Sequence, residues 1–215
     1  MLNLSFSELI ILIPAILIGL TIHELAHAFV ALKLGDDTPK KLGRLTLNPI
    51  KHIDPIGFIL LLIAGFGWAK PVMINRNNLK HPNRDDILIS LAGPFSNLLF
   101  SILLILILKI VIIVNPHISQ NTIESVFSVF IVFLGINIAL GVFNLLPIPP
   151  LDGSHMILNL LSLKSSSISR TYFKYGSFAL LAIILLERIF RINLLPVGRV
   201  VQFITMGLLK LVSLI

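Results

Sequence analysis

Long apolar segments alternate with short polar and basic segments along this chain. Residues 6–34, 87–114 and 126–146 are each long enough to cross a lipid bilayer as a helix. Residues 56–66 are also apolar but are too few to cross, which favours a re-entrant or interfacial segment. The pattern therefore predicts an all-α polytopic membrane protein built around three spanning helices.

The remaining segments give weaker signals. Residues 172–186 and 192–215 are apolar and predict two further C-terminal helices. Whether both cross stays open, because the arginines between them would oppose the charge rule if they lay on the outer side. Apolar and polar residues alternate with period two at 44–48, and 72–74 is a second possible strand.

Composition supports a membrane protein with one domain. The chain is 56% hydrophobic and only 13% charged, whereas a soluble domain carries about 25% charged residues. We therefore expect residues 1–215 to form a single membrane-embedded domain, with a core at about 5–160 and C-terminal helices at about 172–215.

The net charge of +7 comes from basic residues in short loops between apolar segments, so it indicates how the protein is oriented in the bilayer. We therefore expect no nucleic-acid partner. Loops 36–55 and 67–86 are predicted to face the cytoplasm from a multi-pass protein of the inner, or cytoplasmic, cell membrane.

The first apolar segment contains the sequence His-Glu-Leu-Ala-His at residues 23–27. His23 and His27 lie four residues apart, so a helix places them on one face, where both can bind one metal ion. Glu24 lies at the edge of that face, where a carboxylate can take a proton from metal-bound water. An ionisable group at mid-bilayer costs roughly 2.5–3.5 kcal/mol, so a polar patch that only packs helices is the weaker interpretation.

Two histidines do not complete a hydrolytic zinc site, which takes three protein ligands and keeps one position for water. The chain has no cysteine, so the third ligand must be His, Asp or Glu. Asp152 follows a run of prolines that ends the third apolar segment, and Gly153 comes next. From these residues alone, Asp152 is either a ligand or an ordinary turn aspartate, and His155 is a competing ligand.

The chain resembles the site-2 proteases, the intramembrane zinc metalloproteases of peptidase family M50, in their minimal bacterial form without PDZ or CBS domains. The matching motifs occur in family order over roughly residues 19–155 and stand at 23–27, 48–57, 67–72, 92–97 and 144–153.

The resemblance implies a specific chemistry. His23, His27 and Asp152 would bind one Zn²⁺ per chain, and Glu24 would be the general base for a zinc-activated water. The expected substrates are membrane-anchored proteins, cut within or near their transmembrane segments in regulated intramembrane proteolysis. The resemblance also implies a small membrane-associated β-sheet in the loops, whose edge would bind an unwound substrate by strand addition.

Asn97 and Asn144 are implied to line the site, where they would hold the substrate or the developing oxyanion. Their alternative role is hydrogen bonding between helices, which is common for Asn in bilayers.

Two other functions fit the sequence less well. A different class of polytopic His-Glu-x-x-His protease would use a downstream glutamate as third ligand, and only Glu124 and Glu187 are available. A metal transporter or channel would need ionisable residues on several helices, and the second and third apolar segments offer almost none beyond Lys109.

Overall fold

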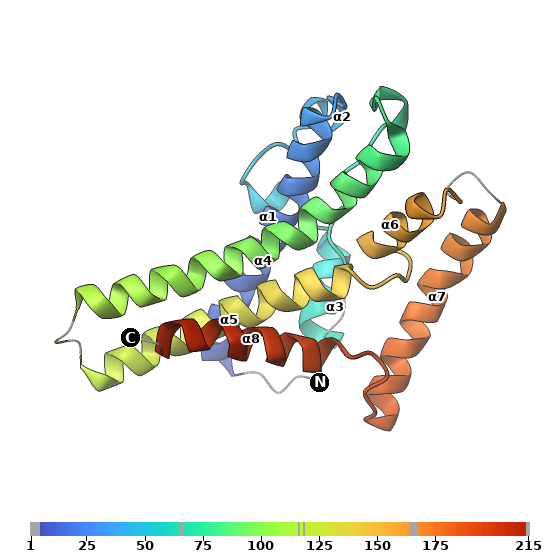
Figure 1. Ribbon diagram of the computed structural model, residues 1–215. Helices are drawn as coiled ribbons and strands as arrows, with labels where there is room; N and C mark the ends of the chain where they lie inside the picture. Colours follow the sequence, from blue (N-terminus) through green and yellow to red (C-terminus); the bar gives the residue numbers. More distant parts are fainter. Residues whose placement is uncertain (1–4, 65–66, 116, 118, 164–166, 214–215) are drawn as a thin grey trace.

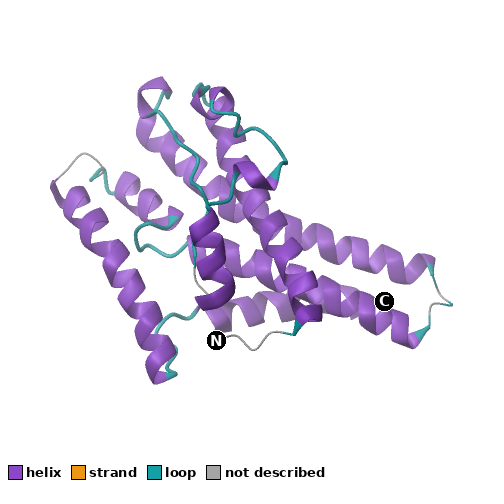
Figure 2. Cartoon of the chain, turned by 180° about the vertical axis from the view of Figure 1, so that it is seen from behind, coloured by secondary structure: helices purple, strands orange, loops and turns teal. Residues whose placement is uncertain are grey.

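The computed structural model describes residues 5–64, 67–115, 117, 119–163 and 167–213, and every regular element in these ranges is a helix (Figures 1 and 2). Three helices are long and apolar enough to cross a membrane: α1 (Phe6–Lys33), α4 (Pro82–Val114) and α5 (Gln120–Asn144). The predicted all-α class and the three spans are therefore confirmed. Helix α4 begins before the expected residue 87, at a proline that is favourable in a first turn.

Helix α1 begins at a capping box and carries the His-Glu-x-x-His residues on its buried face. The Ser5 hydroxyl accepts a hydrogen bond from the Glu8 N–H (3.3 Å), and the Glu8 carboxylate accepts one from the Ser5 N–H (2.7 Å). The helix continues through Pro14. His23 lies two turns beyond that proline, among small buried residues that allow neighbouring helices to approach.

Glycines bring the three long helices close together. A Cβ on Gly19 of α1 would lie 2.8 Å from a methyl carbon of Leu140 in α5. A Cβ on Gly141 of α5 would lie 3.0 Å from the Pro94 carbonyl oxygen of α4. Because the backbones approach this closely, short polar side chains can reach from one helix to the next.

The segment between α1 and α4 consists of short helical pieces: α2 (Thr38–Lys41), η1 (Pro49–Lys51), α3 (Pro55–Ala64) and η2 (Arg76–Asn78). Helix α3 covers the apolar segment predicted at 56–66, of which residues 65 and 66 lie outside the described residues. Asp54 caps it by accepting from the N–H groups of Ile56 (3.0 Å) and Gly57 (2.9 Å). Its short length agrees with a segment that does not cross, while its depth in the bilayer stays a prediction.

The predicted β-sheet is not found: neither 44–48 nor 72–74 forms a strand, and the described residues contain only an isolated bridge between Ile53 and Ala69. Side chains bind backbone groups within and beside these two segments: His52 contacts the Thr46 carbonyl, and Glu24 accepts from the Val72 N–H. Arg44 donates to the carbonyls of Lys51, Lys70 and Pro71.

Two carboxylates hold the second loop in the same way. Glu24 accepts from the Val72 N–H (3.0 Å), and Asp36 accepts from the Asn75 N–H (2.7 Å). These contacts and those of Arg44 fasten the two basic loops to each other and to α1. Both loops therefore lie at the same end of the bundle, as expected if α3 does not cross.

Three helices follow α5: α6 (Asp152–Leu160), α7 (Ser167–Phe190) and α8 (Val197–Ser213). Helix α8 lies along α5, and its apolar residues pack on the buried cluster of Ile105, Leu134 and Ile138 (Figure 1). Helix α7 stands beside the bundle and touches the loop before α6, where Gly176 lies against the ring of Pro149 (Figure 2). The two C-terminal helices expected from the sequence are thus present.

Candidate metal centre

Three side chains from α1 and α6 converge at one point inside the bundle. The Nε2 atom of His23 lies 3.0 Å from Oδ2 of Asp152, and Nε2 of His27 lies 3.3 Å from the same oxygen. The candidate ligand atoms of the three residues all lie within 4.8 Å of one another, although 129 residues separate His23 from Asp152. Ligands about 2.0–2.1 Å from a tetrahedral zinc lie about 3.3 Å apart, so the donor set fits that ion.

The remote nitrogen of each imidazole is held by a hydrogen bond. Nδ1 of His23 lies 2.7 Å from Oδ1 of Asn97, and Nδ1 of His27 lies 2.7 Å from the Ile89 carbonyl oxygen. A carbonyl oxygen only accepts, so each Nδ1 carries a proton. In its neutral form each ring then has its lone pair on Nε2, the atom that lies towards Asp152, and this is the form that binds a metal.

Two glycines keep room for this arrangement. A Cβ on Gly93 of α4 would lie 2.4 Å from Nε2 of His27 and 2.6 Å from Nε2 of His23. A Cβ on Gly153 would lie 2.3 Å from the Leu145 carbonyl oxygen, so the residue after Asp152 must be small where the chain turns into α6. The first glycine leaves open the space in front of both imidazoles, and the second lets α6 begin at Asp152.

Asp152 is the first residue of α6, and α5 has already ended at Asn144, before the prolines. Burial raises the pKa of the Asp152 carboxyl, but the imidazoles of His27 and His23 lower that pKa by more, so it lies well below its usual range. The carboxylate is therefore ionised, as a metal ligand must be.

Glu24 is buried next to the histidines, with one oxygen bonded to the Val72 N–H. Burial lowers the pKa of the nearby Arg44 guanidinium, and the Glu24 carboxylate opposes that shift. Arg44 is buried and holds the two loops together over this end of α1, so the structure places a cation and a backbone amide on the loop side of Glu24.

Asn97 makes hydrogen bonds between helices, which agrees with the second of its two predicted roles. Its oxygen faces His23, and its NH₂ group donates to the Gly19 carbonyl (3.0 Å) and to Oδ1 of Asn137 (3.0 Å). All its polar groups are thus used inside the bundle, because a fully buried amide needs partners. Asn144 donates to the Leu140 carbonyl in its own helix (3.0 Å), and among the described residues no hydrogen bond joins it to the three candidate ligands.

Asn137 was not selected from the sequence. It could have been found from its position, because a polar amide inside an apolar membrane span is energetically costly and therefore usually has a hydrogen-bonding or functional role.

The competing ligands lie elsewhere. The ring of His155 packs edge-on against Phe173 of α7 (centroids 4.9 Å apart), and His155 is not in the convergent group. Glu124 pairs with Gln120 at the start of α5, and Glu187 accepts from the Leu195 N–H (2.6 Å) in the turn before α8. The arrangement does not favour a glutamate as third ligand.

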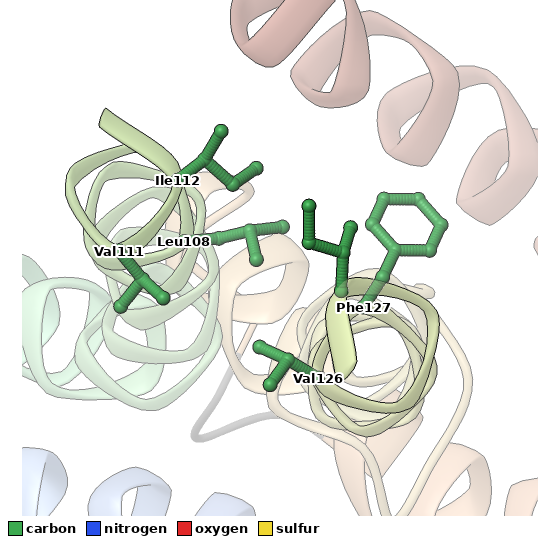
Figure 3. Close-up of a pocket in the computed structure, with 6 residues that line it drawn as sticks. Leu108, Val111, Ile112, Val126 and Phe127 are labelled. Carbon is green, nitrogen blue, oxygen red and sulfur yellow. The ribbon is translucent and has the colours of Figure 1, made fainter. Parts of the chain in front are cut away.

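A second feature, a small cavity between α4 and α5, offers no chemistry (Figure 3). Its volume is about 10 Å³, room for about one water molecule, and apolar side chains line it: Leu108, Val111, Ile112, Ile123, Val126 and Phe127.

Comparison with known proteins identifies the family. Over 149 residues the chain is 46% identical to "Putative zinc metalloprotease YwhC" of Bacillus subtilis, an alignment that covers 69% of this chain and 68% of that protein. The sequence model of Peptidase family M50 matches residues 107–187, which include Asp152. This chain belongs to peptidase family M50. The recognition of a site-2 protease relative from its motifs is therefore confirmed.

Other M50 relatives are more distant. The chain is 35% identical to "Putative zinc metalloprotease Rip2" of Mycolicibacterium smegmatis over 67% of its length, and it spans about half (54%) of that relative. It is 29% identical to "Putative zinc metalloprotease MJ0611" of Methanocaldococcus jannaschii over 71% of its length and 73% of that protein. No solved structure matches the chain. Family membership and three long apolar helices make this M50 protein a multi-pass membrane protein.

Proposed function

We propose that this protein is an intramembrane zinc metalloprotease that hydrolyses peptide bonds within or near the transmembrane segments of membrane-anchored proteins. The observation that carries the proposal is the convergence of His23, His27 and Asp152, within 4.8 Å, inside a bundle of membrane-crossing helices. The names of the relatives point to zinc and to proteolysis. Cleavage of such substrates is the basis of regulated intramembrane proteolysis.

His23, His27 and Asp152 would hold the ion, and zinc bound there supplies Lewis-acid activation of water and of the peptide carbonyl. Glu24 is the general base. Its Oε2 is bonded to the Val72 N–H, which leaves Oε1 to take a proton from water and to return it to the leaving amine. The Val72 bond also fixes the carboxylate, so the base needs no rearrangement before it acts.

Segment 71–75 is a suitable surface for an unwound substrate. Its residues alternate between exposed and partly buried, and it forms no strand with the rest of the described chain. Because the Val72 N–H is bonded to Glu24, this extended segment passes directly over the base. A substrate that added as a strand to its exposed side would place its own backbone next to the catalytic residues.

An open apolar groove lies between α1 and α4. Its volume is about 460 Å³, and it is lined by Ile22, Ser96, Leu99, Phe100, Ile102, Leu103 and Leu106. Ile22 precedes His23 in α1, although none of the candidate ligands lines the groove. On this proposal, the groove offers an apolar surface to the helical part of a membrane-embedded substrate. The basic loops, on this proposal, face the cytoplasm from the inner membrane.

Zinc content and cleavage, measured separately, test the proposal. The wild type, Glu24→Gln and Glu124→Gln are purified in detergent, assayed for bound zinc, and incubated with a panel of single-span membrane proteins. Glu124 is an exposed control at the far end of α5. We expect all three proteins to hold about one zinc, and Glu24→Gln to cut roughly 10²–10⁴-fold more slowly than the other two.

The contrary results have different meanings. If the wild type holds no zinc, the metal centre is wrong. If it holds zinc but cuts no membrane-anchored protein, or if Glu24→Gln cuts as fast as the control, proteolysis by this site is wrong. A metal transporter would in that case be the better interpretation.

A further inference from the structure

A chain of hydrogen bonds crosses the three long helices behind His23. Oδ1 of Asn137 in α5 accepts from Nδ2 of Asn97 in α4 (3.0 Å), and Oδ1 of Asn97 lies 2.7 Å from Nδ1 of His23 in α1. Both asparagines are fully buried. Asn137 therefore reaches a candidate metal ligand through one intermediate side chain, from a helix that provides no ligand itself.

Two backbone carbonyls fix the direction of this chain. Nδ2 of Asn137 donates to the Phe133 carbonyl (2.8 Å), and Nδ2 of Asn97 donates to the Gly19 carbonyl (3.0 Å). Since a carbonyl cannot donate, each amide must turn its NH₂ group towards its carbonyl and its oxygen the other way. At the end of the chain, Nδ1 of His23 must be the donor, so the neutral ring has its lone pair on Nε2, the atom that would bind a metal.

The close approach of α1 and α5 supports the arrangement. A Cβ on Gly19 would lie 3.3 Å from Oδ1 of Asn137, so a glycine stands where the two helices meet beside this amide. Asn137 is held within reach of Asn97 by packing as well as by its bond to Phe133.

We propose that Asn137 is a positioning residue for the metal centre, which holds the Asn97 amide in the orientation that presents His23 to zinc. This inference rests on the proposed function. Without Oδ1 of Asn137, one N–H of Asn97 loses its partner in a buried site, and the Gly19 carbonyl alone holds the amide in its orientation. In the fraction of molecules whose amide turns its NH₂ group towards His23, Nδ1 of His23 has to accept, which moves the ring proton to Nε2 and blocks the ligand atom.

A double-mutant cycle on zinc affinity tests the inference. Dissociation constants are measured by chelator competition for the wild type, Asn137→Leu, Asn97→Ala and the double variant. Thermal unfolding of each metal-free protein monitors folding. Ser101→Ala is the matched control, because Ser101 is also fully buried and donates to the backbone carbonyl of Asn97 (2.9 Å), but makes no bond to the Asn97 amide or to Asn137. It therefore separates loss of a buried bond in α4 from loss of the bond to the Asn97 side chain.

We expect Asn97→Ala to weaken zinc binding by about 10–100-fold, as loss of an outer hydrogen-bond partner does. Asn137→Leu should weaken it at least several-fold, and should have no further effect once Asn97 is Ala, because Asn137 acts only through Asn97. Ser101→Ala should bind zinc like the wild type.

Two outcomes would overturn the proposal: Asn137→Leu binds zinc as tightly as the control, or its effect persists undiminished in the Asn97→Ala background. Should Asn137→Leu fail to fold, Asn137→Ser replaces it in the cycle, because a serine hydroxyl can still donate to the Phe133 carbonyl but is too short to reach Asn97. Loss of zinc by the wild type would refute the proposed function instead, so the two failures are distinguishable.

Discussion

Gly93 lies where a single added methyl group should disable the metal centre. In Gly93→Ala the new Cβ would lie 2.4 Å from Nε2 of His27 and 2.6 Å from Nε2 of His23, whereas ordinary contacts begin at 3.4 Å. Each ring must retreat by about 1 Å, or the methyl group must occupy the space between the ligand atoms. Both responses remove the geometry that zinc requires.

The bonds that hold the two rings set a lower limit on the effect. If the imidazoles retreat, the His23–Asn97 and His27–Ile89 hydrogen bonds, both 2.7 Å, are stretched beyond use. Each is worth about 0.5–1.5 kcal/mol, so together they represent about 1–3 kcal/mol, or about 5–150-fold in the zinc dissociation constant. Ligand atoms displaced by more than about 0.2 Å from bonding distance weaken binding further, so we expect a loss towards or beyond 100-fold.

Gly135→Ala is the matched control, because Gly135 lies in the middle of α5 and its added Cβ meets nothing within 4 Å. That variant should bind zinc normally and be stabilised by up to about 1 kcal/mol, as expected for Gly→Ala in a helix. Zinc affinity by chelator competition and cleavage of a membrane-anchored substrate are measured for both variants. If Gly93→Ala matches Gly135→Ala in zinc affinity, the assignment of this space to the metal is wrong.

Two further predictions concern the surroundings of the site. Burial raises the pKa of Asp36, but its hydrogen bonds to Thr38, Asn75 and Asn78 lower that pKa by a larger amount. The pKa in the folded protein therefore lies below the ordinary value of 3.8. The stability that Asp36 provides is thus complete above about pH 4 and is lost as the pH falls through the folded pKa. Hydrogen exchange of the Asn75 amide should detect this loss as local opening at low pH. If Asp36→Asn opens with the same pH dependence as the wild type, Asp36 is not the group responsible. Gly176→Ala places a Cβ 2.5 Å from the Pro149 ring and should lower the free energy of unfolding by about 1–3 kcal/mol in thermal unfolding. Gly198→Ala is the control, because its added Cβ meets nothing within 4 Å. Equal melting temperatures of the two variants would show that α7 does not depend on the contact with Pro149.

Much of the helical framework could be predicted because its signal is local. Twenty or more consecutive apolar residues form a helix in lipid whatever lies beside them, since all backbone groups are then satisfied within the segment. The predicted sheet failed for the opposite reason. The period-two pattern at 44–48 and the apolar residues at 72–74 predict extended segments, but they do not show what pairs with the backbone. Residues 45–47 form bends instead, and the Val72 N–H is bonded to Glu24. Arg44 binds the Lys70 and Pro71 carbonyls next to the second segment.

The sequence by itself determined the spans, the spacing of His23 and His27, and the family, because these depend on neighbouring residues or on ordered motifs. Only the tertiary structure decided that Asp152 meets the two histidines, since no local pattern brings together side chains 129 residues apart. It also showed that Asn97 bonds to Nδ1 of His23, in agreement with its alternative role between helices, and revealed Asn137 behind it. A buried amide bonds to whatever donors and acceptors the packed helices present, and helix packing fixes those partners.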